Sequence, residues 1–164
     1  MISPKMQDAL NSHIEQELYS AYLYLAMSAY CESKTFKGFG RWLRAQHGEE
    51  LEHALKMLDY LLSRGGRPAL GPIAAPPKEF GTTTQVFEAV LAHERRVTEN
   101  IQAIHAAAGA ERDPASQIFL QWFVAEQVEE EAAASEIVEK LRLVGDRPGA
   151  ELYLDKEYGK RGKG

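Results

Sequence analysis

A chain of 164 residues can bury a sizeable core in one domain, and 45% hydrophobic with 26% charged residues is ordinary for a globular protein. The net charge of −5 gives no reason to expect nucleic acid as a partner, and no apolar run reaches the roughly 20 residues that a membrane helix needs. The single cysteine, Cys31, excludes an intrachain disulfide and favours a reducing compartment, so we expect a soluble, cytoplasmic protein.

The first two predicted helices cover about residues 4–31 and 39–63. Ser3 can cap the first helix, and Pro4 suits its first turn. The segment 35–38 interrupts the helical pattern, and Gly65 with Gly66 ends the second helix. Because the turn between the two helices is short, they should be antiparallel neighbours.

The segment 66–82 is predicted to be an extended crossover. Its prolines exclude a helix: Pro68, Pro72, Pro76 and Pro77. An extended, proline-stiffened chain rises about 3.1 Å per residue, so this segment can span the roughly 40 Å of a long helix. The crossover would therefore return the chain along the bundle and leave the second and third helices parallel.

Two further long helices and a short one are predicted after the crossover. The third covers about 84–108, the fourth about 114–144 with Asp113 as its cap, and the fifth about 149–158. The fifth helix is too short to be stable alone, so it should pack against the bundle or another subunit. The whole chain, 1–164, is predicted to be one all-α domain, a four-helix bundle with a short C-terminal helix. We interpret the basic run Lys160 to Lys163 as a solvated tail.

Polar residues interrupt the apolar stripe of each long helix. They are Glu17, then Glu50 and His53, then Glu94, then Gln127 and Glu130. A carboxylate in a helix-bundle core costs several kcal/mol unless it is paired or bound to a metal. A glutamate and a histidine one turn apart on one face can both reach a metal in a bundle interior.

The two halves of the chain repeat this pattern. A spacing of 33 residues separates Glu17 from Glu50 and also Glu94 from Gln127, and His53 and Glu130 each follow three residues later. One offset of 77 residues superposes the two sets. Two helical hairpins should thus meet about a pseudo-two-fold axis and bring the polar residues together.

Four carboxylates and one imidazole would converge at the centre of this bundle. The carboxylates would repel one another at low dielectric, and two divalent cations would remove that cost. Oxygen-rich ligation with one nitrogen suits iron or manganese better than structural zinc. So few ligands for two metals leave open positions for dioxygen or peroxide, which predicts a dinuclear iron site that oxidises Fe(II).

These motifs resemble those of the bacterial non-haem ferritins over nearly the full chain. The residues that carry the resemblance are Glu17, Tyr24, Glu50 to His53, Glu94 and Ala125 to Glu130. The resemblance implies a ferritin-like bundle that assembles into a hollow homo-oligomeric shell of 24 subunits. It also implies ferroxidase activity, in which Fe(II) is oxidised by dioxygen or hydrogen peroxide and stored as a ferric oxy-hydroxide mineral.

The resemblance also implies individual roles. The ligands of the first iron are Glu17, Glu50 and His53, with Glu50 bridging. The second iron takes Glu94 and Glu130 together with Glu50, and Gln127 lies beside it. A third iron site would use Glu49, Glu126 and Glu129 with Glu130. Tyr24 would form a hydrogen bond near the site and supply an electron, and Trp122 is a weaker candidate for the same role.

Several alternatives stay open from the residues alone. Glu49, Glu126 and Glu129 could form an ordinary charged helix face, and Tyr24 and Trp122 could simply pack. The four other histidines are expected at the surface or at subunit interfaces: His13, His47, His93 and His105. The chain could also be another di-metal carboxylate oxidoreductase, a peroxidase or a catalase-like enzyme, or a Dps-like shell or plain helical scaffold.

Haem is not expected. Haem-binding bacterioferritins would carry Glu-x-x-His in both halves, whereas the second half of this chain reads Gln127-x-x-Glu130. They would also place a methionine where this sequence has Glu52.

Overall fold

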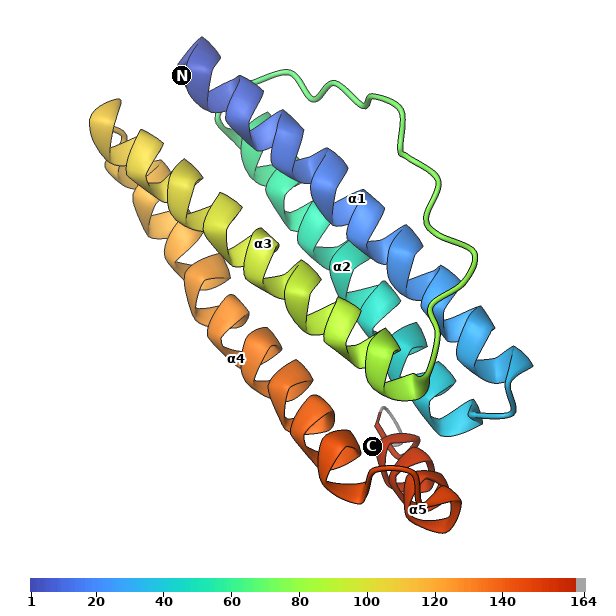
Figure 1. Cartoon of the computed structure of the whole chain (residues 1–164). Helices are drawn as coiled ribbons and strands as arrows, with labels where there is room; N and C mark the ends of the chain where they lie inside the picture. Colours follow the sequence, from blue (N-terminus) through green and yellow to red (C-terminus); the bar gives the residue numbers. More distant parts are fainter. Residues whose placement is uncertain (162–164) are drawn as a thin grey trace.

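The computed structural model describes residues 1–161, and within this range the chain is all-α. The five helices are α1 (Pro4–Ser33), α2 (Lys37–Ser63), α3 (Thr83–Ala110), α4 (Pro114–Val144) and α5 (Pro148–Tyr158). The four long helices lie side by side along a common direction, and α5 lies at the end of the bundle where α4 finishes (Figure 1). The predicted bundle with a short fifth helix is confirmed.

The helix ends carry the caps that the sequence predicts. The Ser3 side chain accepts a hydrogen bond from the Met6 amide at 3.2 Å, and the Asp113 side chain accepts one from the Ser116 amide at 3.1 Å. Thr82 and Gln85 also form a reciprocal capping box at the start of α3, which the sequence analysis did not predict. Gly65, which follows α2, has a positive φ of 72°, a conformation that glycine adopts without a steric penalty.

The α1–α2 turn differs from its prediction in one detail. Gly38 was predicted to interrupt the helix, but α2 begins at Lys37 and includes it. A side chain at Gly38 would meet the backbone carbonyl of Asp155 in α5, so the glycine allows a close helix contact instead of breaking the helix. The Phe39 amide also donates to the Asp155 carboxylate at 2.7 Å, which fixes α5 against α2.

The crossover follows the outside of α1 along the bundle (Figure 1). It is fastened by side chains of α1: the Asn11 amide bonds to the backbone of Arg67 and Ala69, and Glu15 accepts from the Gly71 amide at 2.8 Å. The crossover brings the chain back to the end where α2 began, so α2 and α3 run in the same direction. Within each hairpin, α1–α2 and α3–α4, the two helices are antiparallel.

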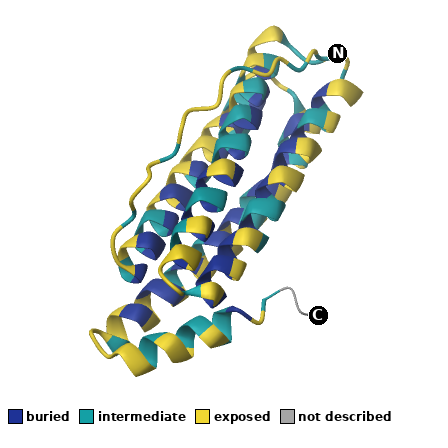
Figure 2. Cartoon of the chain, turned by 90° about the vertical axis from the view of Figure 1, so that its right-hand side faces the viewer, coloured by how far each residue is buried: buried dark blue, intermediate teal, exposed yellow. Residues whose placement is uncertain are grey.

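Two apolar clusters fill the bundle, one toward each end. One contains Tyr24, Phe39, Trp42, Phe87 and Ile137, and the other contains Leu10, Met57, Ile101, Leu120 and Phe123. The buried faces of the helices turn inward along the full length of the bundle (Figure 2). The polar residues of the predicted centre lie between the two clusters in every helix. Among the helices of residues 1–161, none combines the length and apolar character needed to cross a bilayer.

Candidate metal centre

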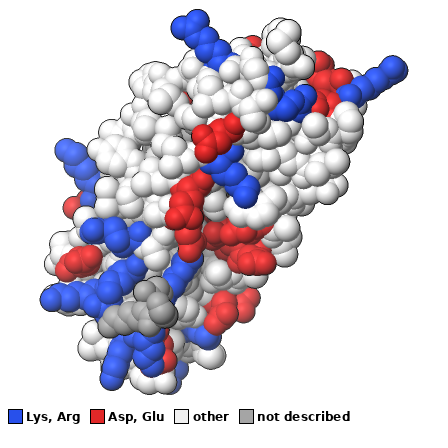
Figure 3. Space-filling view, turned by 180° about the vertical axis from the view of Figure 1, so that it is seen from behind, with Lys and Arg blue, Asp and Glu red and all other residues white. Residues whose placement is uncertain are grey.

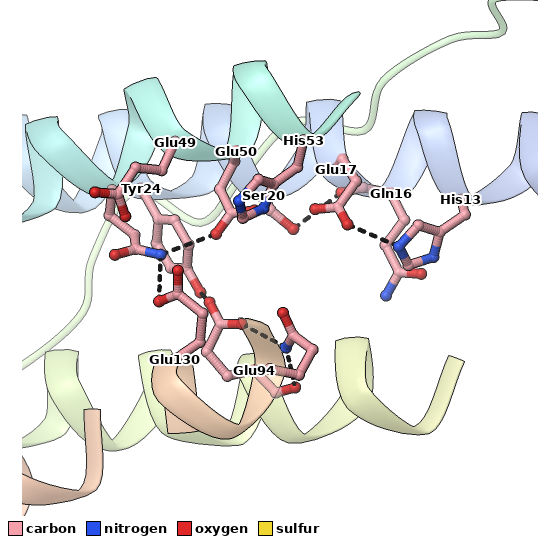
Figure 4. A network of polar contacts seen from close by, with 12 residues as sticks. His13, Gln16, Glu17, Ser20, Tyr24, Glu49, Glu50, His53, Glu94 and Glu130 are labelled. Carbon is pink, nitrogen blue, oxygen red and sulfur yellow. Dashed lines mark hydrogen bonds and ion pairs between the residues drawn. The ribbon is translucent and has the colours of Figure 1, made fainter. Parts of the chain in front are cut away.

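The side chains that interrupt the apolar stripes meet in one buried layer midway along the bundle. Each is at most 6% exposed: Glu17, Glu50, His53, Glu94, Gln127 and Glu130. Each long helix supplies at least one of them, and their polar ends face one another across the interior (Figure 4). The convergence predicted from the internal repeat is therefore present in the structure.

The α1–α2 hairpin brings three possible metal ligands together. One ligand atom from each of Glu17, Glu50 and His53 lies within 4.8 Å of the others. His53 Nδ1 is 3.1 Å from Glu50 Oε2, and Glu17 Oε2 is buried with no hydrogen-bond partner among the described residues. A buried carboxylate oxygen without a partner is costly, so these three side chains fit a divalent cation.

The α3–α4 hairpin holds its carboxylate through two hydrogen-bond donors. The Tyr24 hydroxyl, from α1, donates to Glu94 Oε1. Gln127 Nε2 donates to Glu94 Oε2 at 3.0 Å. Burial, and next the charge of Glu94, raise the pKa of Tyr24 well above its usual range, so the hydroxyl keeps its proton and acts as a donor.

Gln46 joins the two halves, a role that the sequence analysis missed. Its Nε2 donates to Glu50 Oε1 at 3.0 Å and to Glu130 Oε2 at 2.7 Å. Gln46 lies one turn before Glu50 on the inward stripe and is fully buried. A buried amide in an apolar stripe one turn from a predicted ligand was the available signal.

The metal-free centre holds protons at neutral pH. Burial, together with nearby carboxylates, raises the pKa of Glu50 and of Glu94 to about 7 and that of Glu130 to about 8. Burial alone would lower the pKa of His53, but its hydrogen bond to Glu50 and the surrounding carboxylates raise it to about 9. Bound cations would take the place of these protons.

The residues predicted for a third iron site are only partly together. Glu126 forms a second possible ligand group with His53 and Glu130, within 4.8 Å of one another. Glu49 instead forms an ion pair with Arg161 Nη2 at 2.6 Å, and Glu129 is exposed on α4. Acidic side chains gather midway along the face seen from behind (Figure 3).

A cavity of about 380 Å³ leads to His53 from the surface between α2 and α4. Its lining residues are Glu49, Glu52, His53, Lys56, Trp122 and Glu126. The Trp122 ring packs edge-on against the His53 ring at 5.4 Å between centroids, and the Lys56 ammonium lies 3.9 Å from the centroid of the Trp122 ring. Trp122 is thus a partly exposed wall of this cavity.

The prediction that His13 and His93 lie at the surface or an interface is wrong. They are 2% and 3% exposed because polar partners hold them inside: His13 Nε2 is 2.7 Å from Glu17 Oε1, and His93 Nε2 is 2.7 Å from Ser20 Oγ. Burial, and next the charge of Arg96, lower the pKa of His93 to about 4, so it stays neutral. His47 and His105 are half-buried.

The predicted solvated tail is wrong at Arg161. Its guanidinium donates to Gln46 Oε1 at 3.0 Å and to Glu49, and it lies over the Trp42 ring at 4.5 Å. A basic residue near an acidic cluster gains partners that a sequence pattern does not reveal. Residues 162 and 163 of the predicted tail lie outside the described range.

Comparisons with known proteins agree with this geometry. The Ferritin family, described as a ferritin-like domain, matches residues 7–144. A bacterial non-heme ferritin of Bacteroides fragilis is 44% identical over 98% of this chain and 100% of its own length, and one of Escherichia coli O6:H1 is 36% identical over 96% and 95%. The solved structure of an open pore ferritin from Archaeoglobus fulgidus is 51% identical, superposes with a TM-score of 0.97, and matches over 98% of this chain and 99% of that one. The chain therefore belongs to the ferritin family.

Proposed function

We propose that this protein stores iron: it oxidises Fe(II) at the buried centre and deposits ferric oxy-hydroxide inside a shell of identical subunits. The observation that carries the proposal is the buried group of Glu17, Glu50 and His53, in which one carboxylate oxygen of Glu17 has no hydrogen-bond partner in the described part of the chain. The names of its relatives, bacterial non-heme ferritins, support the same function.

Two Fe(II) ions are the substrate of this centre. Glu17, Glu50 and His53 bind the first, and Glu94, Glu130 and the bridging Glu50 bind the second, with Gln127 beside it. The two ions give one electron each to dioxygen, which takes up two protons and becomes hydrogen peroxide. Hydrogen peroxide can in turn oxidise two further Fe(II) ions and yield water. The raised pKa values of Glu50, Glu94 and Glu130 mean that Fe(II) displaces protons when it binds.

Tyr24 has two proposed roles at the centre. Its hydroxyl holds Glu94 Oε1, which orients the carboxylate toward the second iron. Because it contacts a ligand directly, it is also placed to give an electron to the reacting oxygen species. Trp122, which packs on His53 and faces solvent, is a second candidate donor.

A third iron position is proposed at the inner end of the cavity beside His53. Glu126 and Glu130 would hold this ion, and Glu49 would join them after it releases Arg161. Glu129, one turn after Glu126 on the exposed side of α4, would complete the acidic group. Ferric iron would leave the centre by this route.

We further propose that the shell has 24 subunits and lies in the cytoplasm. Exposed apolar side chains on α1 and the crossover support contacts between subunits: Tyr22 is 47%, Leu70 65% and Ile73 42% exposed. Sizing combined with electron microscopy of the purified protein tests the shell directly.

The activity is tested by adding Fe(II) aerobically to the metal-free protein and following formation of ferric iron. Glu50→Ala combined with His53→Ala removes one bridging ligand and the only imidazole ligand, so we expect the initial rate to fall by at least roughly 100-fold. Glu99→Ala changes an exposed glutamate of α3 and should oxidise iron like the unchanged protein. Equal rates in the double variant would refute the assigned centre. Rapid loss of hydrogen peroxide without ferric iron would instead favour the peroxidase or catalase-like alternative.

A further inference from the structure

The two oxygens of Glu17 have different surroundings. Oε1 lies 2.7 Å from His13 Nε2, whereas Oε2 has no hydrogen-bond partner among the described residues. The Glu17 and His13 side chains are each 1% exposed, so bulk water does not reach them. A buried, unpartnered carboxylate oxygen calls for a ligand.

The chemistry of His13 settles which group donates in this contact. A carboxylate only accepts hydrogen bonds, so the proton must lie on His13 Nε2. His13 stands one helical turn before Glu17 on α1, and its ring points at the Glu17 carboxylate (Figure 4). Among residues 1–161, His13 supplies the nitrogen donor to Glu17, and the neighbouring Glu50 carboxyl group, whose pKa is raised partly by Glu17, lies beside it. One imidazole thus decides how this carboxylate is turned.

We propose that His13 is a positioning residue for the first metal: by holding Oε1, it fixes Glu17 as a ligand that binds through Oε2 alone. This inference rests on the proposed function of the centre. A ligand held in its binding orientation loses little conformational entropy when the metal arrives. His13 itself does not touch the metal.

Glu94, the counterpart of Glu17 in the second hairpin, lacks a free oxygen for a metal. Both oxygens of Glu94 already accept hydrogen bonds, from Tyr24 and from Gln127. Glu94 must therefore share an oxygen or release a donor when it binds a metal, and Glu17 does not. The first site should fill before the second for this reason.

The test is a titration of the metal-free protein with Co²⁺, followed by the d–d absorption of the bound ion. His13→Leu keeps much of the ring's volume but removes the donor, and we expect it to weaken the first Co²⁺ by roughly 10- to 100-fold. The d–d bands should also change, because a Glu17 carboxylate released from Oε1 can bind through both oxygens. His13→Gln keeps an N–H donor at the same position and should restore both the affinity and the spectrum.

Two controls separate this inference from the proposed function. Glu17→Ala should lose the first Co²⁺, and unchanged binding in that variant would refute the centre itself. His105→Leu changes a half-buried histidine about three turns beyond Glu94 on α3 and should bind Co²⁺ normally.

If Glu17→Ala loses the ion while His13→Leu binds it with unchanged affinity and spectrum, the positioning role is wrong. Equal weakening in His13→Leu and His13→Gln would also overturn it, because the ring's packing would then matter instead of the donor. His13→Ala replaces the leucine variant if that protein does not fold.

Discussion

The two hairpins of the bundle carry their central residues at equivalent positions but hold them in different ways. In α1–α2 the pair one turn apart is Glu50 and His53, and in α3–α4 it is Gln127 and Glu130. One oxygen of Glu17 has no hydrogen-bond partner among residues 1–161, whereas both oxygens of its counterpart Glu94 accept hydrogen bonds. The repeat therefore keeps the spacing of these side chains and changes their surroundings, which makes the two proposed metal positions unequal.

Helix α1 supports the central carboxylates of both hairpins. His13 on α1 holds Glu17 in the first hairpin, and Tyr24 on α1 holds Glu94 in the second. At the positions of α3 that are equivalent in the repeat stand the apolar residues Val90 and Ile101. The first helix thus gives one hydrogen bond to each carboxylate, and Gln127 on α4 adds the second bond to Glu94, which is the difference between the two hairpins.

The largest expected effect comes from making the two hairpins alike. Gln127→Glu gives the second hairpin the glutamate of the first, but it removes the donor to Glu94 and adds a buried like charge. We expect the metal-free protein to lose about 3–5 kcal/mol of stability, and divalent metal to restore most of it. Thermal unfolding with and without Zn²⁺ measures this. Gln121→Glu, on the exposed face of α4, is the matched control, and equal melting temperatures for the two variants would contradict the prediction.

Removing the distinguishing side chain of each hairpin should affect metal binding unequally. His53→Ala deletes the only imidazole that can act as a ligand in the centre, so the first Co²⁺ should bind at least roughly 100-fold more weakly. Gln127→Ala should weaken binding of the second ion by less than roughly tenfold, because the Gln127 amide donates to the ligand Glu94 and does not bind the ion itself. Calorimetric titration provides both values. Equal losses of affinity in the two variants would mean that the two hairpins contribute equally to metal binding.

A pH series should reveal the protons held in the metal-free centre. The folded-state pKa of Glu130 is raised from 4.5 to about 8, so its carboxyl group destabilises the fold as pH rises from about 4.5 to 8. Glu130→Gln removes this effect. The free energy of unfolding of the variant, relative to that of the unchanged protein, should therefore increase by on the order of 2 kcal/mol between pH 5 and pH 8. Chemical unfolding in the presence of a chelator measures the difference. Glu99→Gln, at an exposed position, should gain far less unfolding free energy over the same pH range. If the unfolding free energies of Glu130→Gln and the unchanged protein differ by the same amount at every pH, Glu130 does not hold a buried proton.

The smallest expected effect is at Tyr24. Tyr24→Phe keeps the ring in the core but removes one hydrogen-bond donor from Glu94. The free energy of unfolding of the metal-free protein should therefore fall by about 1 kcal/mol. If Tyr24 also supplies an electron, that electron replaces one from Fe(II), so the same variant should raise the ferric yield per dioxygen reduced to water. Unfolding and oxygen-electrode measurements check the two roles separately. Tyr22→Phe, on the exposed side of α1, is the control for the loss of a hydroxyl.

The fold could be predicted because its signals are local. Ser3 and Asp113 cap helices where apolar stripes begin, and the prolines of 66–82 leave the chain only an extended path. Gly38 was misjudged because its role depends on the distant Asp155, which approaches it only in the folded bundle. Local patterns do not contain such contacts.

The centre could be predicted only in part, for the same reason. Glu17, Glu50, His53 and Glu94 were found because charges on apolar stripes are costly and the spacing repeats. Gln46, His13 and Arg161 were missed or misplaced because an amide, an imidazole and a tail arginine are common at surfaces. Their partners are set by how the helices pack, not by their position along the chain.

The long crossover has a consequence for how the protein folds. α1 packs most closely against α2 and α3 against α4, so each hairpin can form from contacts that are near in the sequence. The crossover keeps the hairpins tethered, and the entropy of closing a loop grows only slowly with its length. The metal ligands meet only when the hairpins dock, and that docking brings repelling carboxylates together. Divalent ions that bind only the docked form would stabilise it by mass action, so ions at the proposed centre would increase the share of chains in which the hairpins are docked.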